Sequence, residues 1–234
     1  MSNVRRHKGI PLAPLSITMN LTHTLATQVV ATYSTAPQPP FLVAICGWAD
    51  TGKSTLASNL CTSLVRMGVG ADWLSTDAFL KGRSERDALG HTGYNSQSID
   101  GAAMHDAVAI ILNCQDFTYY PYENRTGCRA ANPITLLPQS VVVVEGIHAF
   151  HPAVSKALHL RVFIDADEST LRAMRARANV SKRGMSAIDS HARVDKELED
   201  YRAFTLPLKS QADLVVKVNM EFDYSVWPRG AGDA

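Results

Sequence analysis

Several features that would assign this chain to a specialised class of protein are missing. Its 234 residues include only four cysteines, and no two of them form a C-x-x-C pair. We therefore expect reduced thiols in a cytoplasmic protein, with neither a disulfide framework nor a cysteine-based zinc site. No apolar run approaches the roughly 20 residues that a membrane-spanning helix needs. The net charge of +1 gives no reason to expect nucleic acid or a membrane surface as a partner.

Acidic residues are also absent from the start of the chain, because the first one is Asp50. Residues 1–19 hold two arginines, a lysine and two prolines, so we expect them to form a flexible tail. Arginines in an acid-poor segment are also typical of a mitochondrial transit peptide, which stays open as an alternative. Residues 20–234 contain no repeats and no linker, which predicts a single domain.

The apolar residues of this domain alternate between short runs and helical spacing. The short runs predict buried strands over residues 41–46, 71–75, 141–144, 160–164 and 214–218. The helical spacing predicts helices over residues 21–33, 55–67, 101–114, 168–178 and 189–204. Polar segments over 78–100 and 121–138 are predicted to be loops. Strands that alternate with helices predict an α/β fold with a doubly wound, mostly parallel sheet in three α/β/α layers.

The most informative motif follows the first predicted strand. Gly47-Trp-Ala-Asp-Thr-Gly-Lys-Ser54 fits the phosphate-binding loop (P-loop) pattern G-x-x-x-x-G-K-[ST] in full, between a strand and a helix as this motif requires. Glycines let the backbone wrap closely around phosphates, and the next helix points its positive end at them. The motif therefore predicts a P-loop NTPase. The candidate nucleotide-binding residues in it are Gly47, Asp50, Thr51, Gly52, Lys53, Ser54 and Thr55.

Two residues of this loop are expected to act on ATP and Mg²⁺ directly. Lys53 would reach the β- and γ-phosphates of ATP, and the Ser54 hydroxyl would ligate Mg²⁺. Two acidic residues, Asp77 and Glu145, follow the predicted strands at 71–75 and 141–144. The carboxyl ends of parallel strands share one edge of the sheet, so we expect both acids near the P-loop.

The two acids are expected to divide the chemistry at that edge. Glu145 would hold Mg²⁺ together with Ser54, because hard oxygen ligands suit this ion. Asp77 would accept the proton of an attacking hydroxyl. The alternative is that both residues are helix caps or solvated acids at strand ends.

A basic cluster extends from the predicted helix at 168–178 into the residues that follow. Such a cluster can stabilise charge on a transferring phosphoryl group, whereas the alternative is a solvated helix face. We expect residues 168–186 to form a small lid. The members of the cluster are Arg172, Arg175, Arg177, Lys182 and Arg183.

The order of these motifs resembles that of the uridine kinase and phosphoribulokinase family of small-molecule kinases, over residues 41–218. Ser75-Thr-Asp77-Ala-Phe79 is similar to the family's S-x-D-x-F segment, and Tyr120-Pro-Tyr122-Glu123 to its P-x-Y-D segment. Further matches are Val143–Ile147 to V-x-E-G-I, Arg175–Gly184 to the arginine-rich lid R-x-R-R-D-x-x-x-R-G, and Pro207–Asp213 to P-S-K-x-x-A-D.

The resemblance implies a kinase that uses ATP and Mg²⁺ to phosphorylate a small hydroxyl-bearing molecule. Arg183 would join the nucleotide site, and Tyr122 would help to hold a nucleoside base. The catalytic residues it implies are Asp77, Lys53, Arg175 and Arg177. The acceptor contacts it implies are Asp77, Phe79, Tyr122 and Glu123.

The chain departs from the family pattern near the base-binding segment. Glu123 replaces an aspartate, Asn124 and Arg125 stand where a histidine is usual, and Asn179 takes the place of a lid aspartate. The acceptor therefore stays open between uridine or cytidine and another small alcohol, such as a sugar, glycerate, pantothenate or ribulose phosphate.

Two rival functions are weighed against the kinase. A GTPase switch lacks support, because the chain has no N-K-x-D segment to read guanine. A non-catalytic nucleotide-binding module is the second rival, and the presence of Lys53, Ser54, Asp77 and Glu145 argues against it. A homo-oligomer is compatible with the sequence.

Overall fold

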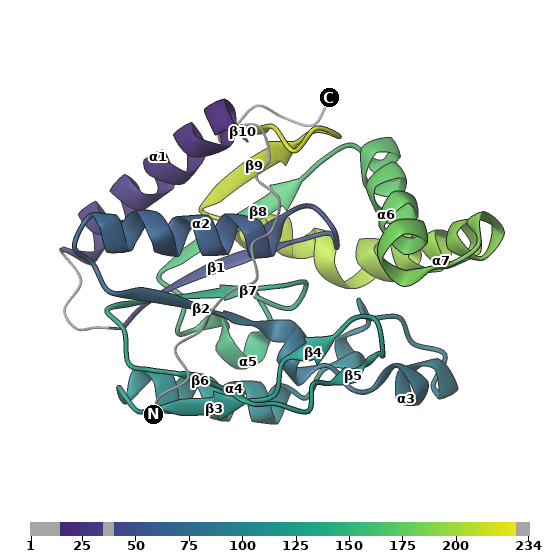
Figure 1. Ribbon diagram of the computed structural model, residues 1–234, viewed down its shortest axis with the longest axis horizontal. Coiled ribbons are helices and arrows are strands. Elements are labelled where there is room, and N and C mark those ends of the chain that lie inside the picture. Colours follow the sequence, from purple (N-terminus) through teal and green to yellow (C-terminus); the bar gives the residue numbers. More distant parts are fainter. Residues whose placement is uncertain (1–14, 35–39, 228–234) are drawn as a thin grey trace.

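The computed structural model describes residues 15–34 and 40–227, so the predicted tail lies outside the described residues as far as position 14. Its centre is a six-stranded sheet with the strand order β10-β9-β8-β1-β7-β2 (Figure 1). Neighbouring strands run parallel, except that β10 is antiparallel to β9. The strands are β1 (Phe41–Gly47), β2 (Ala71–Ser75), β7 (Val141–Glu145), β8 (Leu160–Asp165), β9 (Leu214–Val218) and β10 (Tyr224–Trp227).

The central strands explain why the apolar runs were readable in the sequence. Every residue of β1 and β7 is buried, as expected of parallel strands that are covered on both faces. The register pairs Glu145 with both Ile45 and Ser75. The carboxyl ends of β1, β7 and β2 therefore lie at one level of the sheet.

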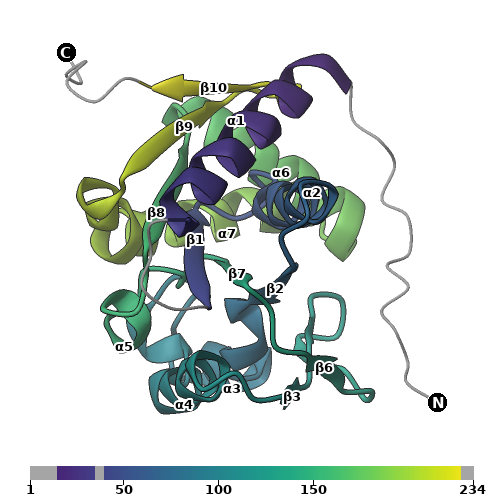
Figure 2. The ribbon, with the colours of Figure 1, turned by 90° about the vertical axis from the view of Figure 1, so that its left-hand side faces the viewer.

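Helices cover both faces of the sheet, which gives the predicted three layers. On one side α1 (Leu15–Tyr33) packs against α2 (Lys53–Arg66), and on the other lies α5 (Pro152–Ser155), in contact with α4 (Gly101–Leu112) (Figure 2). Beyond the carboxyl ends of the strands stand α6 (Glu168–Arg183) and α7 (Ala187–Asp200) (Figure 1). A π-helix (Tyr201–Thr205) and a 3₁₀-helix (Leu206–Gln211) return the chain to β9.

The two segments predicted to be loops contain short elements. Residues 78–100 include α3 (Arg83–Ala88) and a 3₁₀-helix (Ser96–Ser98), and another 3₁₀-helix (Thr76–Phe79) follows β2. Residues 121–138 include the hairpin of β4 (Tyr122–Glu123) with β5 (Cys128–Arg129), and β6 (Ile134–Leu136), which pairs with β3 (Phe117–Tyr119). Elements of two to six residues are too short to produce a readable periodicity.

Some predicted boundaries were also wrong. The first helix begins at Leu15, within the segment predicted to be a tail, and α6 continues to Arg183. The helix predicted over residues 55–67 ends at Arg66, and Met67 just beyond it is 40% exposed. All four cysteines are free thiols. Within the described ranges, no helix is both long and apolar enough to span a membrane.

Candidate active site

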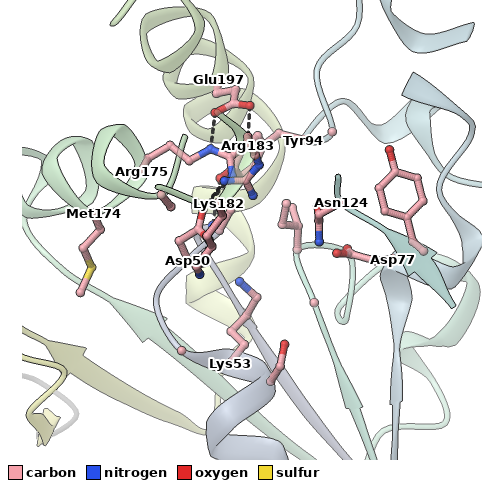
Figure 3. A pocket seen from close by; sticks show the side chains of 18 of the residues that line it. Asp50, Lys53, Asp77, Tyr94, Asn124, Met174, Arg175, Lys182, Arg183 and Glu197 are labelled. Carbon is pink, nitrogen blue, oxygen red and sulfur yellow. Dashed lines mark hydrogen bonds and ion pairs between the residues drawn. The ribbon is translucent and has the colours of Figure 1, made fainter. Parts of the chain in front are cut away.

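A cavity of about 640 Å³ lies at the carboxyl edge of the central strands, and its size suits a small-molecule site. Its walls come from the P-loop, the start of α2, the segments after β2 and β7, and α6 (Figure 3). The predicted site residues that line it are Asp50, Gly52, Lys53, Ser54, Thr55, Asp77, Tyr122, Glu145, Arg175, Arg177 and Arg183.

Four predicted residues do not line this cavity. Gly47 and Thr51 belong to the P-loop, and the Thr51 hydroxyl donates to the Trp48 carbonyl at 2.8 Å, within the loop itself. Phe79 is buried against the Phe117 ring, and Glu123 is exposed in the β4–β5 hairpin. The cavity geometry therefore gives no support to the substrate contacts expected of Phe79 and Glu123.

The P-loop takes its shape from backbone that only some residues tolerate. Gly52 has φ +86°, and a Cβ atom there would lie 2.0 Å from the hydroxyl oxygen of Tyr224. That hydroxyl donates to the Thr51 carbonyl at 3.0 Å, so β10 braces the loop from below. Gly52 is the N-cap of α2, and the first backbone N–H groups of this helix have no partner within it, which is the arrangement that binds phosphate.

Lys53 is buried at the floor of the cavity. Its Nζ donates to the Trp48 carbonyl at 2.5 Å, and the residue is 7% exposed. Burial lowers the pKa of this ammonium, and the nearby carboxylates of Glu145 and Asp77 oppose that effect. The ammonium is thus a poorly solvated positive charge that would gain much from an anionic ligand.

Two carboxylates face Lys53, those of the buried Glu145 and the half-buried Asp77. Burial raises the pKa of Glu145 to about 7, with a further rise from Asp77 and an opposing effect of Lys53. Burial also raises the pKa of Asp77, against the influence of Lys53 and Arg86. Asp77 therefore adds to the cost of ionising Glu145, and a cation bound beside the two carboxylates would lower that cost.

The residues present fit a magnesium ion. The Ser54 hydroxyl donates to Glu145 Oε1 at 3.1 Å, which brings a hydroxyl and a carboxylate oxygen together beside the P-loop. Mg²⁺ prefers oxygen ligands and is commonly held by one or two protein groups, with water and substrate phosphates completing the shell. Ser54 and Glu145 provide such a pair.

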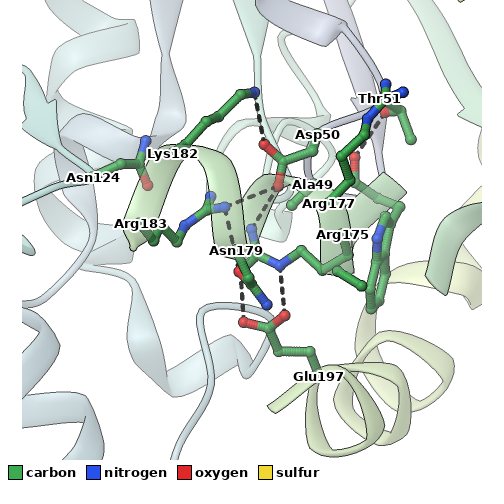
Figure 4. A network of polar contacts seen from close by, with 12 residues as sticks. Ala49, Asp50, Thr51, Asn124, Arg175, Arg177, Asn179, Lys182, Arg183 and Glu197 are labelled. Carbon is green, nitrogen blue, oxygen red and sulfur yellow. Dashed lines mark hydrogen bonds and ion pairs between the residues drawn. The ribbon is translucent and has the colours of Figure 1, made fainter. Parts of the chain in front are cut away.

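The carboxylate of Asp50 binds the lid, which its assignment to nucleotide binding did not foresee (Figure 4). Its oxygens lie 2.7 Å from Arg175, 3.1 Å from Lys182 and 3.2 Å from Arg183. Burial acts to raise the pKa of Asp50, but these three cations outweigh it and hold the pKa well below its usual range. An anion of the P-loop thus keeps the basic cluster over the cavity.

Glu197 of α7 holds the same arginine from the other side. The guanidinium of Arg175 donates twice to Glu197, at 2.6 Å each, and Arg193 donates to Glu197 at 2.9 Å (Figure 4). Arg177 lines the cavity with its guanidinium 5.7 Å from the centre of the Phe222 ring. Arg172 instead pairs with Glu168 and Asp195 at half-exposed positions outside the cavity, as the alternative of a solvated helix face predicts.

Sequence reasoning missed several polar residues that line the cavity. Among them are Arg83 and Arg86 of α3, with Tyr94 and Asn124, and the last two are labelled in Figure 3. The Tyr94 hydroxyl accepts from the Ala49 backbone N–H at 2.9 Å, and its ring stacks on Trp48. A polar stretch predicted as loop hid α3, although arginines three positions apart share a helix face.

The chain matches a known protein family along most of its length. The sequence model of the phosphoribulokinase/uridine kinase family matches residues 42–225. A uridine kinase from Leuconostoc citreum is 23% identical over 193 residues, which cover 76% of this chain and 87% of that protein. The chain spans only 38% of some longer curated relatives.

Solved structures with the same fold include other small-molecule kinases. D-glycerate 3-kinase from Cryptococcus neoformans is 14% identical, with a TM-score of 0.66 over 91% of this chain and 99% of its own. Phosphoribulokinase from Rhodobacter spheroides is 15% identical, with a TM-score of 0.59 over 82% of both chains. These likenesses support the P-loop kinase fold.

Proposed function

Because the chain belongs to the phosphoribulokinase/uridine kinase family, we propose that it transfers the γ-phosphoryl group of ATP to a hydroxyl group of a small molecule. A bond forms between the acceptor oxygen and the γ-phosphorus, the bond from that phosphorus to the β–γ bridging oxygen breaks, and ADP leaves. The proton of the acceptor hydroxyl passes to Asp77. The catalytic domain covers residues 20–234, with residues 168–186 as its lid.

The observation that carries this proposal is the meeting of donor and acceptor chemistry in one cavity. Lys53 and the P-loop lie at its floor, and Asp77 stands in the wall beside them. Phosphoryl transfer has a loose transition state, so alignment of the hydroxyl and stabilisation of phosphate charge account for most of the catalysis. The half-buried Asp77 carboxylate, whose pKa is raised, can align that hydroxyl and take its proton.

The remaining residues divide between metal and phosphate. Ser54 and Glu145 would hold Mg²⁺, which when bound neutralises charge on the β- and γ-phosphates. Arg175, Arg177 and Arg183 would close over the phosphates and exclude water. For Arg175 and Arg183 this requires that phosphate oxygens compete with Asp50 for the same guanidinium groups.

The acceptor falls into one of two classes that related proteins suggest. The match to a uridine kinase suggests uridine or cytidine, whereas the structural likeness to a D-glycerate kinase suggests a small polar alcohol. We further propose a cytoplasmic protein with no nucleic-acid or membrane partner, and a homo-oligomer is compatible with this function.

An acceptor screen tests the proposal. ADP release is measured with ATP and Mg²⁺ against a panel of nucleosides, sugars and hydroxy acids, and phosphorylated product is identified by mass spectrometry. We expect ADP release that depends on one acceptor class and exceeds hydrolysis without acceptor. Tight ATP binding without transfer to any panel member would favour a non-catalytic nucleotide-binding module instead.

A further inference from the structure

Arg86 is a buried cation with no ionic partner. It is 4% exposed, its Nε donates to the Lys81 carbonyl at 3.1 Å, and its Nη2 donates to the Tyr122 hydroxyl at 2.7 Å. Its guanidinium lies 5.8 Å from the centre of the Tyr122 ring. Among the described residues, no carboxylate lies within ion-pair distance of Arg86, and its Nη1 has no hydrogen-bond partner.

A buried charge without an ionic partner lowers the stability of the folded state, so the burial of Arg86 needs a reason. In the part of the chain that the structure describes, the buried cations are Lys53, Arg86 and Arg175. Arg175 has two carboxylate partners, Asp50 and Glu197. Lys53 has none within ion-pair distance, and the P-loop explains it as a ligand of the phosphates of ATP. Arg86 is in the same situation on the acceptor side of the cavity.

Arg83 is a second arginine of the same cavity with an unused hydrogen-bond donor. It lies one helical turn before Arg86, lines the same cavity, and donates through Nη2 to the Asn124 carbonyl. Its Nε is buried without a hydrogen-bond partner among the described residues. Two guanidinium groups with unused donors thus line the same cavity as Asp77. Guanidinium is the side-chain group best suited to bind two oxygens of a carboxylate or phosphate.

Tyr122 is the residue to which the family resemblance assigns the binding of a nucleoside base. Its hydroxyl accepts a hydrogen bond from Arg86, and its ring lies under the same guanidinium. These contacts place a positive charge where an uncharged base would have to bind, and leaving that charge unpaired next to a neutral ligand would cost binding energy.

We propose that Arg86 and Arg83 form an anion subsite, so that the acceptor is an acidic alcohol whose carboxylate or phosphate binds there while its hydroxyl faces Asp77. This inference rests on the proposed kinase function and narrows its acceptor class. An uncharged nucleoside would be a poor acceptor. The rival explanation is that Arg86 only balances the charge of Asp77 across the cavity, since Arg86 opposes the rise in the pKa of Asp77.

Matched pairs of alcohols that differ in one anionic group separate these explanations. The pairs are D-glycerate with glycerol, pantothenate with pantothenyl alcohol, ribulose 5-phosphate with ribulose, and uridine 5′-monophosphate with uridine. Binding is measured by calorimetry with the P-loop saturated by a non-hydrolysable ATP analogue and Mg²⁺, so that anions cannot bind at the donor site. Inorganic phosphate serves as the smallest probe, and the first and third pairs distinguish a carboxylate from a phosphate.

We expect the acidic member of at least one pair to bind roughly 10- to 100-fold more tightly than its neutral partner, the scale for hydrogen bonds to a charged group. Arg86→Gln should remove most of this preference, Arg83→Gln part of it, and Arg86→Lys should retain some. Lys81→Gln is the matched control, because its side chain pairs with Glu85 and does not line the cavity. Melting curves identify variants that fail to fold, and Arg83→Gln tests the subsite if Arg86→Gln is one of them.

The outcomes separate the subsite from the kinase function. Equal affinity for the two members of every pair, no binding of any probe, or a preference that survives both arginine variants would overturn the anion subsite. If Arg86→Gln lowers kcat equally for acidic and neutral acceptors and shifts the pH profile, Arg86 serves Asp77 and the proposal is wrong. Binding of an acidic member that depends on Arg86, without any transfer, would support the subsite and contradict the kinase function.

Discussion

At the scale of single residues, the site brings together ionisable groups that would each destabilise the folded protein if they were charged without a partner. Lys53 and Glu145 are buried and Asp77 is half-buried, and loss of solvent shifts the pKa of each toward its neutral form. Residues with this behaviour in a cavity are typical of functional sites rather than of packing.

Replacement of Lys53 by alanine tests the donor side. Lys53→Ala should lower turnover by on the order of 10²- to 10³-fold, because one charge-stabilising donor is lost from the phosphates. The fold should survive, since among the described residues the ammonium makes a single hydrogen bond, to the loop carbonyl of Trp48. Steady-state kinetics with circular dichroism provide the measurement, and Lys196→Ala, an exposed position on α7, is the control. Unchanged turnover in folded Lys53→Ala protein would refute the assignment.

The ionisation of Glu145 should make the stability of the protein depend on pH when a chelator has removed Mg²⁺. Its pKa of about 7 in the folded protein exceeds the ordinary 4.5, so the folded state binds the proton more tightly than the unfolded chain does. The free energy of unfolding should therefore fall as pH rises from about 4.5 to about 7. The two pKa values, 4.5 and about 7, correspond to a loss of about 3 kcal/mol in the free energy of unfolding.

Glu145→Gln removes this ionisation and provides the measurement. Relative to wild type, the variant should gain in melting temperature at pH 8 compared with pH 5, while its Mg²⁺-dependent activity is lost. Calorimetric scans at the two pH values check this. An identical difference between variant and wild type at pH 5 and pH 8 would show that folding does not raise the pKa of Glu145.

At the scale of elements, the lid is held down by the P-loop residue Asp50 and by Glu197 of α7. Three lid cations share the Asp50 carboxylate, so this one anion contributes much of the electrostatic attraction between α6 and the P-loop. Phosphates of ATP carry more negative charge than one carboxylate and can take over these contacts.

Asp50→Asn should loosen the lid. In the absence of ATP, limited proteolysis within residues 168–186 should become several-fold faster, because the lid cations lose their shared anion. ATP and acceptor together should slow cleavage in wild type and variant alike. Asp195→Asn is the control, since it removes a similar charge from an exposed pair with Arg172 on the outside of the lid. Equal cleavage rates with and without ligands would contradict a mobile lid.

Elements differ in how far the sequence could predict them. The strands β1 and β7 were predicted because continuous apolar runs are typical of strands covered on both faces. The P-loop, Asp77 and Glu145 could be placed because strand ends share one edge of the sheet. The β4–β5 hairpin and α3 were missed because they are short and their neighbours in space, not their own patterns, determine them.

Contacts between distant parts of the chain also explain which partners were missed at the site. The pair of Arg175 with Glu197 joins residues on different helices, and Asp50 meets the lid across more than a hundred positions of the chain. Such contacts leave no trace in local spacing, so Asp50 was assigned to the nucleotide and Arg175 to the lid without either partner. Arg86 was missed for the same reason.

At the scale of the whole molecule, the residues proposed to bind ATP, Mg²⁺ and the acceptor converge on one cavity at the carboxyl edge of the sheet. Ligands that bind the folded state should therefore stabilise the entire domain, by an amount that depends on their concentration relative to their affinity.

Magnesium provides one test at this scale. ATP with Mg²⁺ should raise the melting temperature more than ATP with chelator, and activity should vanish in excess chelator and return when Mg²⁺ is restored. Ser54→Ala should require more Mg²⁺ for half-maximal activity, because one of the two proposed oxygen ligands is missing. Full activity in excess chelator would show that the reaction does not need Mg²⁺.

The turnover number of an Asp77→Asn variant, at saturating ATP and acceptor, tests the central claim most directly. Asparagine keeps the shape of the side chain but removes the carboxylate that would align the hydroxyl and accept its proton. The account predicts a fall in kcat of roughly 10²-fold or more, with ATP affinity and melting temperature close to wild type. Near-normal kcat in the folded variant, accompanied by a lower melting temperature, would show that Asp77 is a structural residue and would contradict the proposed mechanism.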